Sequence, residues 1–114
     1  MEAEPKIGKI IIAPEVIETT ARLTTLAVSG VVSLISPPGM PRLLRHDGVK
    51  IQVIGNSVDV KLYVVTEPHV NMLNVGRQIQ SEVTRAIRDI IGMQVQSIDV
   101  YIEDTAQSLE KEEA

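Results

Sequence analysis

The sequence predicts a small α+β domain of two layers, with a mixed or antiparallel sheet of four to five strands and two helices on one face. One observation is the alternation of apolar and polar residues on both sides of Gly55-Asn56, which is typical of a half-buried hairpin. Another is the three- and four-residue spacing of apolar residues from 70 to 90, which indicates a helix with one buried face. A helix with one apolar face and a strand with one apolar face must each bury that face against another element. We therefore expect two layers, with the elements in the order β-α-β-β-β-α-β.

The first third of the chain is predicted to hold two short strands around a helix. Residues 8–12 form an apolar strand candidate, and Pro14 then begins a helix, because its missing N–H costs nothing in a first turn. That helix runs to about residue 28 and ends before Gly30, a common stop signal. Residues 31–35 form the next strand candidate. The helix face expected to be apolar carries Ile17, Ala21, Thr24 and Val28.

The register of the central hairpin follows from its two-residue turn. The turn at Gly55-Asn56 sets apolar residues opposite one another on one face, whereas a slip by one residue would set Val53 against Asp59. The expected pairs are Val53 with Val58, Ile51 with Val60, and Val49 with Leu62. The same register sets Lys50 against Lys61 on the other face.

The second half of the chain contains a long helix and a last strand. The helix is expected to start near Val70 and to end at Gly92, and the strand then alternates with Ile98, Val100 and Ile102 inward. Residues 1–6 and 105–114 are predicted to be tails, the second of them acidic. The ordered unit is therefore a single domain over residues 7–104.

Composition excludes several classes of function. Eleven basic and fifteen acidic residues give a net charge of −4, and aromatic residues make up 2% of the chain, which disfavours nucleic-acid binders that depend on charge and base stacking. The absence of Cys excludes thiol catalysis and thiolate metal sites. No apolar run approaches the roughly 18 residues of a membrane span, so we expect a cytoplasmic protein that does not enter the membrane itself.

A search for catalytic groups finds no convergent set. The two histidines, His46 and His69, have no second ligand at helical spacing, and both are expected to be solvated loop residues. Ser57 and Ser81 lie outside any nucleophile motif, and no glycine-rich phosphate loop occurs. The sequence therefore predicts a protein that is not an enzyme and that holds no metal or cofactor.

Two surfaces are candidates for partner binding. Arg77, Arg85 and Arg88 fall at roughly 0, 80 and 20 degrees around the second helix, and form either a basic docking stripe or an ordinary solvated face. Arg42 and Arg45, in the Pro-rich loop 36–48, could extend that stripe. The same loop carries Met40, Leu43 and Leu44, which form either an exposed recognition patch or a cover over the open end of the core.

Several stretches resemble the alkaline shock protein family of bacterial envelope-stress proteins, in an order and spacing that cover residues 8 to about 104. The resembling stretches are residues 8–17, Ser29-Gly30-Val31, residues 59–65, residues 70–92 and residues 95–104. The resemblance implies a non-catalytic cytoplasmic protein of envelope homeostasis, which self-associates or is held at the membrane by a separate anchored protein. It supplies no catalytic residues. The Pro-rich segment 36–41 and Gly76 depart from the family pattern.

The leading hypothesis is a scaffold or adaptor of the envelope stress response, which acts through protein contacts and self-association near the inner face of the membrane. The alternative is a small nucleic-acid-binding module that uses the basic face of the second helix.

Overall fold

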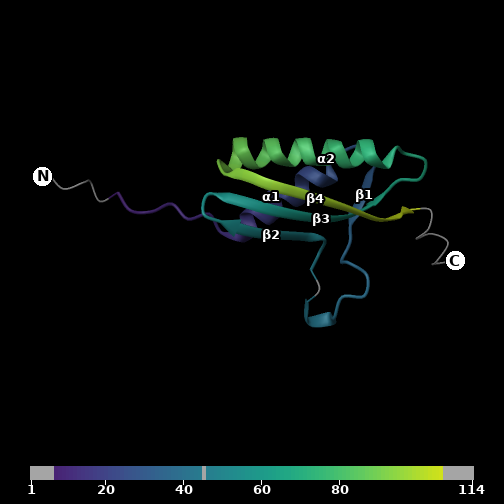
Figure 1. Ribbon diagram of the computed structural model, residues 1–114, viewed down its shortest axis with the longest axis horizontal. Helices are drawn as coiled ribbons and strands as arrows, with labels where there is room; N and C mark the ends of the chain where they lie inside the picture. The colour runs from purple at the N-terminus through teal and green to yellow at the C-terminus, as the bar shows by residue number, and fades with distance from the viewer. Residues whose placement is uncertain (1–6, 45, 107–114) are drawn as a thin grey trace, which may run out of the picture.

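The computed structural model describes residues 7–44 and 46–106, which form two helices packed on one mixed sheet (Figure 1). In chain order the elements are α1 (Pro14–Leu26), β1 (Val31–Leu34), a 3-10 turn η1 (Arg42–Leu44), β2 (Val49–Ile54), β3 (Ser57–Thr66), α2 (Met72–Ala86), a π-helical turn η2 (Ile87–Ile91), and β4 (Gln94–Thr105). Of the expected tails at 1–6 and 105–114, residues 1–6 and 107–114 lie outside the described residues, and Thr105 is the last residue of β4.

Strand β3 is the centre of the sheet. Along one edge β4 pairs with it in parallel, from Ser57 opposite Gln94 to Thr66 opposite Thr105. Because β4 occupies that whole edge, β2 and β1 share the other edge end to end. Both run antiparallel to β3, β2 beside residues 57–62 and β1 beside residues 64–66.

Tyr63 lies where β1 and β2 meet. Its N–H donates to the carbonyl oxygen of Gly48 at 2.9 Å, and its carbonyl oxygen accepts from the N–H of Ile35 at 2.9 Å. A β-carbon added to Gly48, whose φ is +90°, would lie 2.8 Å from the Ile35 nitrogen and 2.9 Å from its oxygen. The backbone at Gly48 therefore lies directly against the backbone at Ile35. The chain between these two residues leaves the sheet as a projecting loop. We call residues 36–44 with 46 and 47 the finger.

The predicted hairpin register is confirmed at every position. Val49, Ile51 and Val53 face Leu62, Val60 and Val58, and Lys50 faces Lys61. The predicted inward face of the last strand is less enclosed, with Ile98 buried and Val100 and Ile102 half-buried.

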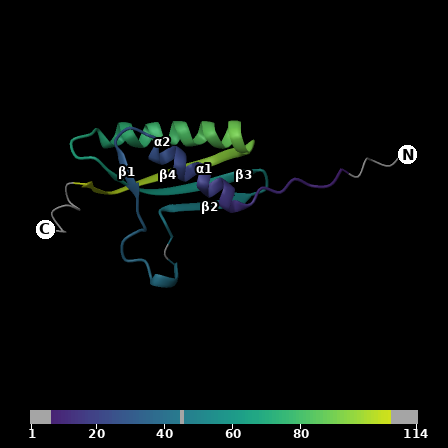
Figure 2. The ribbon, with the colours of Figure 1, turned by 180° about the vertical axis from the view of Figure 1, so that it is seen from behind.

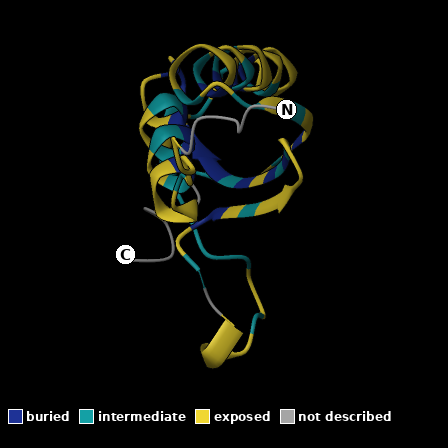
Figure 3. Cartoon of the chain, turned by 90° about the vertical axis from the view of Figure 1, so that its left-hand side faces the viewer, coloured by how far each residue is buried: buried dark blue, intermediate teal, exposed yellow. Residues whose placement is uncertain are grey.

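The core lies between the helices and one face of the sheet, which confirms the two-layer α+β prediction (Figures 2 and 3). Helix α1 packs against β2 and β1, and α2 runs along β4. The fully buried large side chains include Ile17, Leu62, Ile79 and Ile87. On α1 the buried threonine is Thr25, whose hydroxyl donates to the Ala21 carbonyl oxygen at 2.7 Å, whereas the predicted Thr24 is half-buried.

The strand predicted over residues 8–12 does not form, so the sheet has four strands. Residues 7–12, which we call the arm, run outward from the end of the sheet (Figure 1) and pair with no described strand. Of the arm, Ile12 packs against the core. The apolar composition that suggested a strand is real, but a strand also needs a neighbour whose backbone groups can pair with it.

Helix α2 starts at Met72, two residues after the expected start, because the Asn71 side chain caps it by accepting the Asn74 N–H at 3.0 Å. Its last turn widens into η2 before Gly92, whose φ of +83° ends the helix as predicted. The widened turn changes the direction in which residues 87–91 point.

Gly76 lies in the middle of α2, and a β-carbon added there meets nothing within 4 Å. No close approach of another backbone therefore requires a glycine. We expect Gly76→Ala to stabilise the protein by about 1 kcal/mol, because alanine has the higher helix propensity. Urea unfolding followed by circular dichroism measures this, and an unchanged or lowered midpoint would contradict it.

Candidate interaction surfaces

The tip of the finger exposes apolar side chains. Leu43 is 96% exposed and Leu44 is 65% exposed, both in the turn η1. The Leu44 N–H donates to the Pro41 carbonyl oxygen at 2.9 Å, which fixes the turn that presents them. Of the two sequence interpretations, the leucines therefore form an exposed patch and do not cover the core, whereas Met40 is half-buried.

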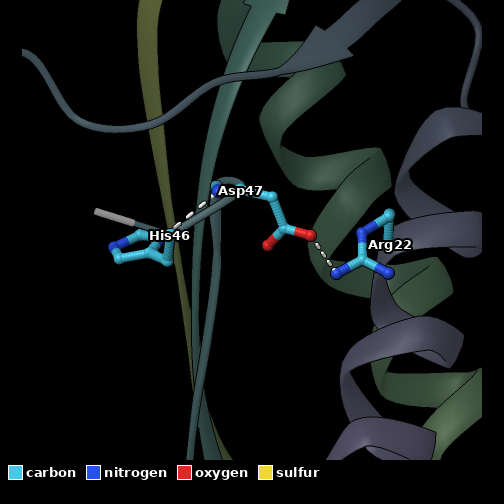
Figure 4. A network of polar contacts seen from close by, with 4 residues as sticks. Arg22, His46 and Asp47 are labelled. Atoms are coloured by element: carbon cyan, nitrogen blue, oxygen red, sulfur yellow. Dashed lines mark hydrogen bonds and ion pairs between the residues drawn. The ribbon is translucent and has the colours of Figure 1, made fainter. Parts of the chain in front are cut away.

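The base of the finger is attached to the domain at several points (Figure 4). Arg22 of α1 forms an ion pair with Asp47, and His46 Nδ1 accepts the Gly48 N–H at 3.2 Å. The His46 ring lies 5.5 Å from the ring of Tyr63, which stacks on Tyr101 at 4.6 Å. His46 is thus half-buried against an aromatic pair, contrary to the prediction of a solvated loop histidine. His69 is exposed, as predicted.

The arginines of the second helix line different grooves. Arg77 lies beside a groove of about 230 Å³ between α2 and β4, and donates to Asn74 Oδ1 at 3.3 Å. Arg85 lies beside a groove of about 510 Å³ between α1 and the end of α2, where Glu82 is 3.7 Å away and Asp89 also lines the wall. Arg88 is exposed on η2. The neighbouring carboxylates of Glu82 and Asp89 therefore offset part of the positive charge at Arg85.

The finger and the α2 arginines do not form one surface. Arg42 lies in η1 at the end of the finger, and Figure 1 shows the finger and α2 on opposite sides of the sheet. Arg45 lies outside the described residues. The predicted extension of the basic stripe from the loop is therefore wrong for Arg42.

The groove between the helices is an apolar surface that the sequence reasoning missed. Leu23 is 62% exposed and Ile90 is 73% exposed, and both line it. The available signal was that Leu23 falls outside the predicted buried face of α1. Ile90 was assigned to the buried stripe of an ordinary α-helix, whereas the structure places it in the π-helical turn η2 with its side chain exposed.

Comparison with known proteins identifies the family. The model of the alkaline shock protein family, described as having a cell envelope-related function, matches residues 2–106. The chain belongs to the alkaline shock protein family. A curated relative, the uncharacterized protein YloU of Bacillus subtilis (strain 168), is 24% identical over 111 residues, which cover 90% of this chain and 92% of YloU. The resemblance predicted from the sequence is confirmed.

Solved structures share the fold of this chain at low sequence identity. A variant of the MamM CTD in a zinc form matches with a TM-score of 0.52 and 17% identity, over 79% of this chain and 84% of that one. Another variant in a manganese form matches with a TM-score of 0.51 and 16% identity, over 79% of this chain and 96% of that one. Because the sequence identities are this low, the structural likeness shows a common fold alone.

The described part of the chain holds no group of three or more His, Asp or Glu side chains placed to bind a metal ion. Within the same residues, no helix has the length and apolar character needed to cross a membrane.

Proposed function

We propose that this alkaline shock family protein is a non-catalytic adaptor of the cell envelope, which self-associates and binds a membrane-anchored protein through its finger. The observation that carries the proposal is the pair of exposed leucines, Leu43 and Leu44, at the end of a loop whose base is attached to the domain. An adaptor of this kind acts at the inner face of the membrane without entering it.

The finger is suited to specific recognition because its shape is restricted before binding. Pro37, Pro38 and Pro41 fix their own φ angles, and the ion pair between Arg22 and Asp47 joins the base to α1. A loop with little freedom loses little conformational entropy when a partner binds it. Exposed leucines on such a loop fit a hydrophobic pocket on a partner as anchor residues.

A protein pocket is a better match for this tip than a lipid surface. A single myristoyl chain gives only marginal membrane binding, and two leucine side chains offer less apolar surface than that chain. The tip is therefore too small to hold the protein on a bilayer. A protein pocket that fits the two leucines in shape gains more binding free energy from them than a bilayer does.

Site-specific photo-cross-linking in the protein's own cells tests the proposal. A photoreactive side chain at Leu43 should give a discrete adduct with one envelope protein, and Leu44→Ser in the same chain should reduce its yield about tenfold. The same probe at Lys61, which is exposed on the outer sheet face, is the matched control and should give no such adduct. Adducts of equal yield at both positions, or adducts with lipid alone, would refute binding through the finger.

A further inference from the structure

The arm carries an unusual amount of exposed apolar surface. Ile7 is 89% exposed, Ile10 is 94% exposed and Ile11 is 80% exposed, which makes this the most exposed group of isoleucines in the described chain. Isoleucine is a strong strand former, and the arm residues after Gly8, whose φ is +82°, pair with no described strand. An apolar segment with unpaired backbone groups is suited to add to a sheet edge.

The outer edge of β2 offers the complementary groups. Its even-numbered residues bond to β3, as the hairpin register and the hydrogen bond from Tyr63 to Gly48 require. The N–H and C=O groups of Val49, Ile51 and Val53 therefore point away from β3, and no described residue pairs with them. The four arm residues after Gly8, Lys9 to Ile12, can cover about 13 Å of the roughly 20 Å that the six residues of β2 span.

The other edge of the sheet is less open. Strand β4 forms that edge, and α2 runs along it. The Gln80 side-chain nitrogen of α2 donates to the Ile98 carbonyl oxygen at 3.0 Å, so a backbone acceptor in the middle of β4 already has a partner. Edge pairing through β4 would have to displace this contact, whereas pairing through β2 displaces none.

We propose that the arm of one copy adds as a fifth strand to the outer edge of β2 in a second copy. The inference rests on the self-association included in the proposed function and names the segments that perform it. The finger leaves the sheet at Gly48, directly before the first residue of β2, so it lies beside one end of the proposed acceptor edge (Figure 1).

The arm passes the end of its own β2 and then continues outward, since Ile10 and Ile11 line a groove with Val53 and the β2–β3 turn. Ala13 is held in an extended conformation, with φ −63° and ψ 138°, as expected for a residue that precedes proline. Ile12 packs against the core and Pro14 begins α1, so a reversal of the chain would have to occur at Ala13. The arm instead continues outward, beyond the end of the sheet at the β2–β3 turn (Figures 1 and 2).

The donor arm and the acceptor edge are different surfaces of one molecule. Contacts of this kind build open chains unless two copies exchange arms reciprocally and close as a dimer. Pairing would also cover Ile10 on the side of the sheet that carries the helices, whereas Ile11 alternates to the outer face. One arrangement thus pairs the open backbone groups of β2 and buries the side chain of Ile10.

Sedimentation velocity on the full chain over a wide concentration range tests the proposal. The unaltered protein should form dimers or longer species, and Ile10→Pro with Ile11→Pro should weaken association at least about tenfold. In a strand, the N–H groups of alternate residues point toward the same neighbouring strand. Two adjacent prolines are used because one of them must then remove an N–H that would donate to β2. The control pair Leu23→Ser with Ile90→Ser removes apolar surface of comparable exposure from the groove between the helices and should leave association unchanged.

Each outcome decides between the two proposals. Association that survives the prolines refutes arm addition but leaves self-association intact. An unaltered protein that stays monomeric at every concentration refutes both arm addition and self-association, and circular dichroism verifies that the variants are folded.

Engineered disulfides report which strand the arm lies beside, because the chain has no Cys of its own that could react. A Lys9→Cys chain mixed with a size-tagged Lys50→Cys or Gln52→Cys chain should form a mixed disulfide under mild oxidation. The matched partner Asp99→Cys, exposed on β4, should not. A disulfide within one chain carrying both Lys9→Cys and Gln52→Cys at high dilution would show that the arm folds back on its own sheet, and would overturn the proposal.

Discussion

Gly48→Ala should destabilise the protein by about 3 kcal/mol or more. Part of the loss, about 1–2 kcal/mol, is the cost of a left-handed conformation, since φ at Gly48 is +90°. The rest arises because the new β-carbon would meet backbone atoms of Ile35 at 2.8 and 2.9 Å. Those atoms cannot move away without breaking the Ile35 hydrogen bond to Tyr63 that joins β1 to the sheet.

Gly39→Ala is the matched control for this prediction. Gly39 also has a positive φ, +77°, but a β-carbon there meets nothing within 4 Å. We expect it to cost about 1–2 kcal/mol, from backbone conformation alone. Urea unfolding by circular dichroism measures both variants, and equal losses would show that the contact with Ile35 contributes nothing.

Ile79→Ala should destabilise the protein by about 2–5 kcal/mol. Ile79 is 0% exposed and lies on the face of α2 that packs on the sheet, so its truncation leaves a cavity that neighbours fill only in part. The loss shows as a lower urea midpoint with an unchanged slope, as for a change in stability without a change in the unfolded state.

Leu73→Ala on the same helix is the control for Ile79→Ala. Leu73 is 70% exposed, so the same kind of truncation should change stability by no more than about 0.5 kcal/mol. If the two variants lost similar stability, Ile79 would not be part of the core as the structure describes it.

The hairpin shows what local sequence can determine. Val49, Ile51 and Val53 alternate with polar residues, and the Gly55-Asn56 turn permits two residues between the strands, so both signals select the same register. The burial of α2 follows in the same way from its apolar spacing. The family was also recognisable from sequence, because it depends on the order of such local segments.

The arm shows where this reasoning fails. Its isoleucines have strand propensity, but a strand exists only if another strand lies alongside, and propensity does not supply one. Likewise, the angles of Arg77 and Arg85 around an ideal helix did not show that α1 and β4 flank α2 on different sides. Nor did they anticipate the π-helical turn at 87–91 or the exposure of Ile90 within it.

The sequence by itself therefore determined the elements formed by contacts between near neighbours, namely the hairpin register, the buried face of α2 and the α+β class. The tertiary structure alone decided that β1 and β2 share one edge of β3, that the finger leaves the sheet at Gly48, and that the edge of β2 stays open. The physical reason is that β4 occupies the whole opposite edge of β3. Which strands pair depends on backbone groups far apart in the chain, and no local pattern specifies that choice.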